Sequence, residues 1–349
     1  MNYSTDPLVR PYRDGDEDQL VDLFLAAYGH PITRDHWRWK LRGAGSLANV
    51  WLAQIEDRIV FQYAGIPLRI QLAGVPATAM VAVDAMTAPE FRRRGLLTTV
   101  VQRAHSNWRD QGIAFVLGLP NEHWGSRTRA LGWQRLFPLQ WLFQPLRPEG
   151  LIAYRLKAPW AGKVTAFGSL WNRWLRTRFR PDSRLRMENV AIAGDEFDHL
   201  WRRGRSESLV TPVRDRQWVD WRFFASPMHT YQVVLAQDDK GPAGYCVYRI
   251  KRASLTLLHV AEIVTAHDHP QVRDSLLSHI IEQASNAGAH GVVALAVTGS
   301  DHFRWLRHAC FMRGPAFMVH LVPLDRQLPA EALRDVRHWN LTGAEFDVV

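Results

Sequence analysis

The pattern of hydrophobic and polar positions predicts an α/β fold for the first half of the chain. Apolar residues recur at helical spacing from Glu17 to Tyr28, and Asp16 is a candidate N-cap. Later runs predict, in chain order, strands over 50–54, 59–64 and 78–86, a helix over 95–111, a strand over 113–119 and a short helix ending at 132. Strands joined by crossover helices imply a mixed sheet with a parallel part.

The second half repeats this order of elements. Its pattern predicts a helix over 196–205, strands over 231–236, 245–250 and 256–264, a helix over 270–287 and a strand over 291–297. Short sequence matches recur in the same order at offsets of roughly 180 positions, pairing 39–54 with 221–237, 89–92 with 270–273, and 129–133 with 307–311. We therefore predict two copies of one α/β unit, over residues 1–147 and 188–349.

Residues 148–187, between the two copies, are rich in proline, arginine and tryptophan. Aromatic and leucine side chains recur at helical spacing over 165–180 with arginines interspersed, which predicts a basic amphipathic helix. Such a helix either packs its apolar side on the two domains or lies on an anionic membrane surface. The sequence leaves both interpretations open.

Composition narrows the class of protein. The chain has 349 residues, of which 47% are hydrophobic, so it can build a core and is not disordered as a whole. Its net charge of +9 suits an anionic partner, although a bias toward arginine codons is an equal explanation. The chain has only two cysteines, far apart, and its N-terminus has no signal-peptide pattern. It also has no run of about 18 apolar residues, and we therefore predict a cytoplasmic protein.

The most informative stretch runs from Val81 to Val100. A strand ends there, the turn Arg92-Arg93-Arg94-Gly95 follows, and a helix begins at once. Backbone N–H groups at a helix start are unsatisfied, and the helix dipole favours negative charge beside them. A glycine lets the backbone approach a phosphate closely, and arginines add charge and donors. We therefore predict an anion site suited to a pyrophosphate.

Residues 92–97 (Arg-Arg-Arg-Gly-Leu-Leu) resemble the acyl-CoA pyrophosphate loop of the GNAT superfamily of N-acetyltransferases, Arg/Gln-x-x-Gly-x-Gly/Ala. They match at Arg92 and Gly95 and depart at Leu97. Residues 117–121 and 131–133 are similar to the later strand and the Gly-aromatic ending of that superfamily. The resemblance covers residues 8–136 well and the second half weakly. It implies two GNAT-like domains in tandem, and the chain resembles a bacterial subgroup of acyltransferases of about this length.

The resemblance implies an N-acyltransferase that moves an acetyl or other acyl group from acyl-CoA to a primary amine by direct attack, without a metal. The strand 83–87 would separate from 113–119 and open a V-shaped slot for the pantetheine arm. That arm would pair with Ala85, Met86 and Thr87, and the Met86 N–H would polarise the thioester carbonyl. The remaining cofactor contacts would come from Arg92, Arg93, Arg94, Gly95, Leu96, Leu97, Thr98 and Asn121.

Acyl transfer also needs groups that move protons. Where the superfamily often has a tyrosine acid this chain has Thr128, so Ser126 or a water would take that role. The base candidates, by position alone, are Asp84, Glu122, His123 and His36. Each also has a purely structural interpretation, as a cap, an ion-pair partner or a solvated side chain.

An acceptor cleft needs aromatic and polar side chains near the slot. The candidates are His36, Trp37, Trp39 and Trp124, with core packing as the alternative for the tryptophans. The acceptor would be a small-molecule amine, with an amino sugar as one example.

The second copy departs from the phosphate-loop pattern. It has Arg273-Asp274-Ser275-Leu276 in place of Arg-Arg-Arg-Gly. Asp274 would repel a pyrophosphate and Leu276 would block the close approach of the backbone. We expect this degenerate copy not to bind acyl-CoA, to support the first domain and to form one wall of the acceptor site.

The sequence also bears on two other classes of function. The chain would be a non-catalytic acyl-CoA sensor or membrane-surface module if the missing tyrosine reflects lost chemistry. A nucleic-acid-binding role is disfavoured because the arginines are scattered and no known motif occurs. The densest metal-like cluster, His267-Asp268-His269, has loop spacing and no third ligand nearby, so no metal is expected.

Overall fold

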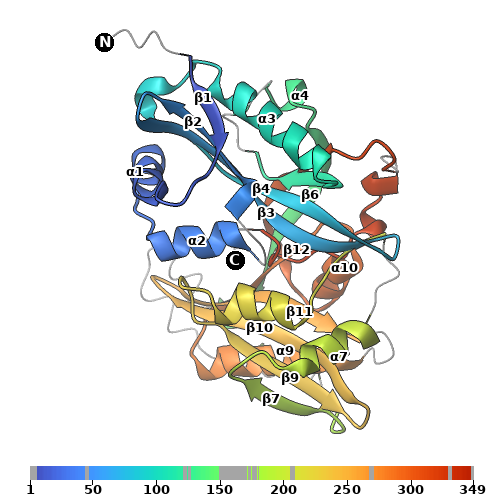
Figure 1. Cartoon of the computed structure of the whole chain (residues 1–349). Coiled ribbons are helices and arrows are strands. Elements are labelled where there is room, and N and C mark those ends of the chain that lie inside the picture. The colour runs from blue at the N-terminus through green and yellow to red at the C-terminus, as the bar shows by residue number, and fades with distance from the viewer. Residues whose placement is uncertain are drawn as a thin grey trace.

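The fold is taken from a computed structural model. The structure describes residues 6–43, 47–120, 124, 127–148, 171, 174, 179, 181–204, 209–266, 271–328 and 332–346. Two α/β halves share one continuous sheet, with the first half above the second in Figure 1. Within the described residues the strand order is β1-β2-β3-β4-β5-β13-β6-β12-β11-β10-β9-β7, and β8 lies beside β3. This architecture confirms the expected mixed α/β class.

The first half follows the predicted order closely. Its elements are β1 (Leu8–Pro11), α1 (Glu17–Tyr28), α2 (Arg34–Arg42), β2 (Val50–Ile55), β3 (Arg58–Leu72), β4 (Val75–Thr87), α3 (Leu96–Asp110), β5 (Phe115–Gly118), α4 (Arg127–Ala130) and β6 (Gln134–Pro145). Asp16 occupies the N-cap position of α1, as predicted, but its side chain makes no capping bond and instead pairs with Arg10 at 2.7 Å. The sequence pattern did not predict α2 or β6.

Alternation along β3 assigns the helices to opposite faces of the first-half sheet. Tyr63 contacts α3 through a 2.9 Å hydrogen bond between its hydroxyl and His105 Nε2. One residue earlier, Gln62 points the other way and accepts a 3.0 Å hydrogen bond from the indole of Trp37 on α2. We call these the α3 face and the α2 face.

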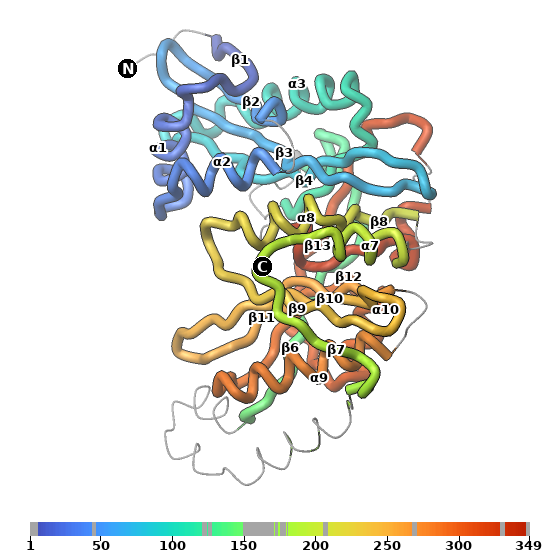
Figure 2. Tube along the Cα trace, turned by 60° about the horizontal axis from the view of Figure 1, so that its bottom comes forward, coloured from blue at the N-terminus to red at the C-terminus, as the bar shows by residue number. Residues whose placement is uncertain are grey.

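The second half repeats this plan. Its elements are β7 (Arg186–Val190), α7 (Asp195–Arg203), β8 (Val210–Pro212), α8 (Arg216–Val219), a π-helical turn (Asp220–Phe224), β9 (Gln232–Asp238), β10 (Gly241–Arg252), β11 (Thr256–Thr265), α9 (Gln271–Asn286), β12 (Gly291–Val297), α10 (Asp301–His308) and β13 (Met312–Pro323). Figure 2 shows this half, in yellow to red, beneath the blue and cyan first half.

The two halves exchange their last strands. β6 pairs antiparallel with β12 of the second half, with Trp141 opposite Leu295. Reciprocally, β13 pairs antiparallel with β5 of the first half, with His320 opposite Gly118. β6 and β13 also pair with each other, which joins the halves into one sheet. The boundaries 1–147 and 188–349 remain a prediction for the domains, but each segment contributes its last strand to the other half.

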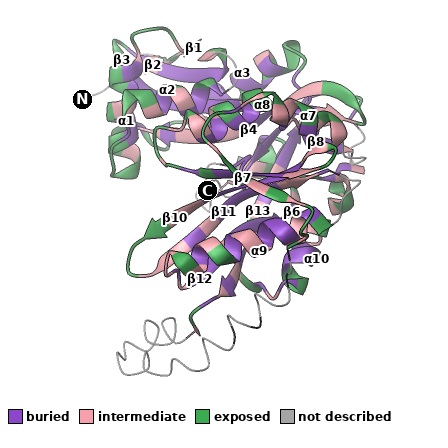
Figure 3. Ribbon diagram, turned by 90° about the horizontal axis from the view of Figure 1, so that it is seen from below, coloured by how far each residue is buried: buried purple, intermediate pink, exposed green. Residues whose placement is uncertain are grey.

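The largest continuous core lies between the halves. Ile66 and Leu68, on the α2 face of β3, belong to the same buried cluster as Leu235, Tyr245 and Val247 of the second half. In Figure 3 the buried residues, in purple, follow the central strands. At about 25 cal/mol per Å² of apolar area removed from water, such a core fixes the two halves relative to each other.

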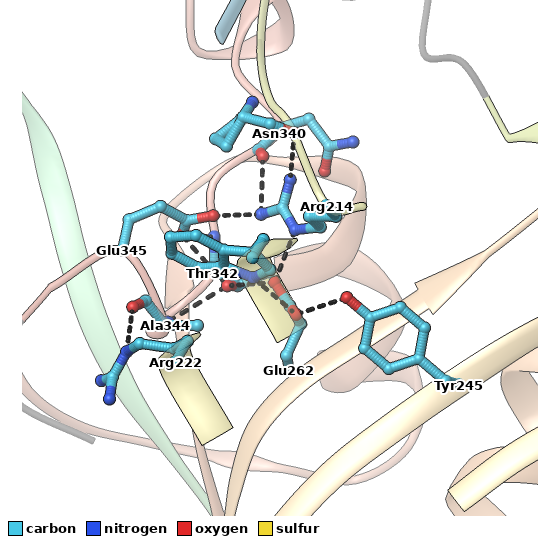
Figure 4. Close-up of polar contacts among 10 residues, drawn as sticks. Arg214, Arg222, Tyr245, Glu262, Asn340, Thr342, Ala344 and Glu345 are labelled. Carbon is cyan, nitrogen blue, oxygen red and sulfur yellow. Dashed lines mark hydrogen bonds and ion pairs between the residues drawn. The ribbon is translucent and has the colours of Figure 1, made fainter. Parts of the chain in front are cut away.

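The C-terminal tail is tied to the second half by a buried ionic network (Figure 4). Arg214 donates from Nε to Glu262 at 2.5 Å and also pairs with Glu345. Glu262 accepts a further bond from the Tyr245 hydroxyl at 2.6 Å. Burial raises the pKa of the Glu345 carboxyl, and so does the negative charge of Glu262, which shares the same arginine. From this anchor the tail reaches Arg222, whose Nε donates to the carbonyl of Ala344 at 2.8 Å.

The helix predicted over 165–180 lies largely outside the described residues. Three side chains from it are described. The Trp171 indole donates to the carbonyl of Pro145 at 2.7 Å, and Phe179 is buried with the second-half core. Trp174 stacks on Trp171 at 5.2 Å between ring centroids and is 43% exposed. These contacts agree with packing on the protein, and membrane contact through this segment stays a prediction that liposome flotation would test. Within the described ranges, no helix is both long and apolar enough to cross a membrane.

Candidate active site

The predicted slot exists where β4 and β5 separate. The two strands pair in parallel only from Met80 opposite Val116 to Ala82 opposite Gly118. β5 ends at Gly118, whereas β4 continues to Thr87. The last residues of β4 therefore have no parallel neighbour in β5, and their backbone groups are open to an extended ligand.

A cavity of about 140 Å³ occupies this separation. Its lining comes from both faces of the sheet and consists of Tyr28, Tyr63, Ala82, Val83, Asp84, Ala85, Gly118, Leu119, Pro120, Trp124 and Trp133. Gly118 is required here because a Cβ at this position would lie 2.8 Å from the ring of Trp133. Trp124 then packs edge-on against Trp133 at 5.9 Å between ring centroids. The slot thus has an aromatic wall.

A β-bulge shapes the other side of the slot. The β3–β4 register shifts between Gln62 and Ala64, so Asp84 and Ala85 together face Tyr63. Asp84 has a φ of 49°, which aspartate tolerates better than most residues. Bulges of this kind redirect side chains and bend the strand.

The strand register corrects the role predicted for Met86. The Ala88 N–H donates to the Val60 carbonyl at 2.9 Å, so it points toward β3. Backbone N–H groups alternate along an antiparallel strand, and Met86, two residues earlier and opposite Gln62, also points toward β3. The N–H groups of Ala85 and Thr87 therefore face the slot instead. Ala85 replaces Met86 as the candidate to polarise a thioester carbonyl.

The arginine turn has the geometry of an anion site. Arg93 and Gly95 have φ values of 64° and 82°, and the first intrahelical hydrogen bond of α3 runs from Thr99 N–H to the Gly95 carbonyl at 3.2 Å. This leaves the N–H groups of residues 96–98 outside the helical ladder. Arg92, Arg93 and Arg94 are all exposed beside them. A Cβ on Gly95 would touch nothing within 4 Å, so its glycine is needed for φ rather than for space.

Asp84 forms a buried ion pair on the α2 face. Its Oδ1 lies 2.9 Å from Nζ of Lys40, and the two side chains are 9% and 5% exposed. The structural alternative of an ion pair therefore holds for Asp84, and its partner is a lysine on α2. Asp84 also lines the slot, so a carboxylate stands at the point where an amine would approach from the α2 face.

The residues predicted to line the acceptor cleft lie in different places in the structure. Trp37 is fully buried and bonded to Gln62, so its predicted place in a cleft is wrong. Trp39 exchanges two hydrogen bonds with Trp221 of the second half, and His36 lies 5.9 Å from the Trp39 ring. Trp124 lines the slot. The candidates Asn121, Glu122, His123 and Ser126 lie outside the described residues.

Sequence reasoning missed the pair formed by Tyr63 and His105. Tyr63 lines the slot, and its hydroxyl is 2.9 Å from Nε2 of His105 on α3. Burial lowers the pKa of His105 to about 4, so the imidazole is neutral at pH 7. The two residues are 42 positions apart and share no local motif, so only the fold brings them together.

The corresponding region of the second half keeps the separation of its parallel strands but has different side chains at the start of the helix that follows. The parallel pairing of β11 and β12 ends at Val260 opposite Ala294, as in the first half. Asp274 accepts a 2.7 Å hydrogen bond from the Trp305 indole, while Leu276 is fully buried. A cavity of about 380 Å³ remains there, lined partly by the C-terminal tail. The described residues contain no cluster of three or more potential metal ligands.

Comparison with known proteins finds one family to which the first half of the chain is similar. A family model described as an acetyltransferase (GNAT) domain matches residues 8–136. No curated protein matches the sequence. Among solved structures, a probable N-acyltransferase from Enterococcus faecalis is similar at 13% identity and TM-score 0.67, covering 92% of this chain and 74% of that one.

Two further structures show the same likeness. A GCN5-related N-acetyltransferase from Anabaena variabilis shares 14% identity at TM-score 0.66, covering 92% of this chain and 73% of that chain. The N-myristoyltransferase of Saccharomyces cerevisiae, solved with bound myristoyl-CoA, shares 11% identity at TM-score 0.59, covering 91% and 79%. At these identities the likeness establishes a shared fold along nearly the whole chain.

Proposed function

Because a GNAT acetyltransferase domain model matches residues 8–136, we propose that this chain is an N-acyltransferase that moves an acetyl group from acetyl-CoA to a primary amine. The observation that carries the proposal is the alignment of the β4–β5 slot with the turn at Arg93–Gly95. One strand, β4, forms a side of the slot and then leads directly into that turn.

Donor binding follows from the geometry of these two features. The pantetheine arm would pair with the open backbone of Ala85 and Thr87, as an added strand does at a sheet edge. Its pyrophosphate would bind the free N–H groups of the first turn of α3, where the helix dipole and three exposed arginines favour negative charge. The thioester would then lie in the aromatic slot.

The transfer step needs a neutral amine and a stabilised oxyanion. The amine nitrogen attacks the thioester carbonyl carbon, the C–N bond forms, and negative charge develops on the carbonyl oxygen beside the Ala85 N–H. Asp84 would take the proton released from the amine, with Lys40 positioning its carboxylate. The C–S bond then breaks, and the CoA thiolate takes a proton from Tyr28 or Tyr63, the two hydroxyl side chains among the lining residues.

Release of free CoA thiol tests this proposal. The purified chain is incubated with acetyl-CoA and a panel of primary amines that includes amino sugars, and thiol is measured with a chromogenic disulfide. The proposal expects thiol release that depends on an amine and yields one N-acetyl product for each thiol. If the chain binds acetyl-CoA tightly but no amine accelerates release, the non-catalytic sensor is the better account.

A further inference from the structure

A basic patch lies on the second-half sheet, on the side that faces the first half. Arg249 and Lys251 are two residues apart on β10. Their side chains therefore lie on the same face of the sheet as Tyr245 and Val247, which belong to the core between the halves. His259 of β11 is directly opposite Arg249. His229, in the segment before β9, is close enough to both arginine and lysine to feel their charge. We call Arg249, Lys251, His259 and His229 the basic patch.

The patch has no acidic counterpart among the described residues. Burial and the neighbouring cations Arg249, Lys251 and His229 lower the pKa of His259 to about 4, so every charge that acts on this imidazole is positive. Burial, with Arg222 nearby, also lowers the pKa of Arg249. No ion pair joins any of the four residues to a described carboxylate. Cations gathered without acids cost stability unless an anion joins them.

Hydrogen bonding at the patch is also incomplete. Nε of Arg249 and both ring nitrogens of His259 are buried, and none has a hydrogen-bond partner in the described protein. Buried polar atoms in native proteins are almost always paired, and exceptions mark places where a ligand or a bound water belongs. Among the described residues, Arg249 and His259 therefore lack an ion-pair partner, and these three buried nitrogens lack an acceptor or donor.

Two aromatic side chains of the central strands, Phe317 and Trp141, lie between the slot and the patch in the strand order. Phe317 lies on β13, next to β5, and Trp141 lies on β6, the next strand of the sheet. The Trp141 ring is 6.1 Å from the His259 ring, measured between centroids. Phe317 is 41% exposed although it lies in a central strand of the sheet.

A second set of contacts joins the patch to the reacting end from the side of α2. Arg222, which acts electrostatically on Arg249, lies 5.9 Å from the Trp39 ring. Trp39 is the neighbour of Lys40, and Lys40 holds Asp84. The slot and the patch are thus two ends of one surface.

We propose that the basic patch binds an anionic group, a carboxylate or a phosphate, on the amine acceptor. The acceptor would lie with its amine at Asp84, its middle on Phe317 and Trp141, and its anionic group at Arg249 and His259. This inference rests on the proposed N-acyltransferase function and names the class of acceptor: amines that carry a separate negative charge. It also gives a specific role to part of the net charge of +9.

Binding measured by calorimetry in the presence of CoA tests the inference without requiring turnover. The probes are matched pairs whose charged groups lie at opposite ends: glucosamine 6-phosphate against glucosamine, and 6-aminohexanoate against hexylamine, with inorganic phosphate as the minimal anion. We expect the anionic member of at least one pair to bind at least tenfold more tightly, and Arg249→Gln to remove that preference. Which pair responds distinguishes phosphate from carboxylate recognition.

Arg252→Gln is the matched control. Arg252 is exposed at the end of the same strand. It is three residues after Arg249 and two after Ile250, so its side chain lies on the opposite face of the sheet from Arg249. It should leave every affinity unchanged. Equal binding of both members of each pair, no binding of any anionic probe, or equal effects of Arg249→Gln and Arg252→Gln would overturn the inference. Acetyl transfer to the same probes tests the proposed function separately, because an enzyme that prefers neutral amines would satisfy one proposal and refute the other.

Discussion

Trp39 and Trp221 exchange hydrogen bonds across the junction of the two halves. The Trp39 indole donates to the Trp221 carbonyl at 2.7 Å, and the Trp221 indole donates to the Trp39 carbonyl at 3.0 Å. The two residues occupy equivalent places in the repeat, 182 positions apart. This reciprocity is what an approximate twofold axis between two copies of one unit requires.

Removing one of these indole donors should loosen the junction. Trp39→Phe keeps most of the ring but leaves the Trp221 carbonyl without its donor, which should lower the free energy of unfolding by about 1–3 kcal/mol. Trp51→Phe is the matched control, because the buried Trp51 indole has no hydrogen-bond partner in the part of the chain that the structure describes. Denaturant unfolding compares them, and equal losses would contradict the role given to the Trp39 bond.

Asp84→Asn should separate catalysis from donor binding. Asparagine tolerates the φ of 49° at this position, so the bulge should persist while the carboxylate is lost. We expect kcat to fall about 100-fold, in the range that general-base catalysis supplies, while the Kd for acetyl-CoA stays within about twofold. Glu90→Gln removes an exposed carboxylate from the short turn over 89–91 that follows β4, and should leave kcat unchanged. An Asp84→Asn enzyme with full kcat would exclude Asp84 as the proton acceptor.

In the buried network around Arg214, removing the arginine should lower the free energy of unfolding much more than removing one of its two carboxylates. Arg214→Met leaves the Glu262 and Glu345 carboxylates buried without a cation and should cost about 3–5 kcal/mol. Glu345→Gln keeps an acceptor for the Thr342 N–H and removes one of two carboxylates that share a single arginine. Because burial already raises the pKa of Glu345, this change should cost less than about 1 kcal/mol at pH 7. Thermal unfolding of both variants measures the difference, and a larger loss for Glu345→Gln would contradict this reading of the network.

His105 should make the protein less stable in mild acid. Its pKa is about 4 in the folded protein and near 6.5 when exposed, so the unfolded chain binds more protons between these values. The contribution of His105 to the free energy of unfolding is therefore fully present above pH 6.5. It falls as the pH drops toward 4, by at most about 1.4 kcal/mol per pH unit. His105→Gln should flatten the pH dependence of the free energy of unfolding in that window. His308→Gln, on an exposed histidine, serves as the control, and equal slopes in all three proteins would be the contrary result.

The sequence predicted local features of the fold more reliably than pairings between distant residues. The helix over 17–28 and the turn at Arg92–Gly95 follow from short-range periodicity and from one glycine. The exchange of β6 and β13 did not, because nothing local in 134–145 says that its partner is a strand about 150 residues later. The role of Met86 was misassigned for a related reason, since the direction of its N–H depends on register with β3.

The active-site partners show the same limit. Asp84 was a candidate from its position in the motif, but Lys40 and His105 entered only through the fold. Trp37 illustrates the opposite error: a tryptophan near a motif was assigned to a cleft, and its indole instead satisfies Gln62 inside the core. The basic patch could not be recognised from the sequence because its members come from three separate segments.

Titration of acetyl-CoA by calorimetry, in wild-type protein and two glycine variants, tests the central claim most directly. Gly95 and Gly112 lie at opposite ends of α3 with φ values of 82° and 76°, and a Cβ on either would touch nothing within 4 Å. Replacing either by alanine should therefore impose a similar backbone strain of about 1 kcal/mol. The account predicts one site per chain in the wild-type protein, at least tenfold weaker binding in Gly95→Ala, and unchanged binding in Gly112→Ala. Two sites per chain, or equal affinities in both variants, would contradict it.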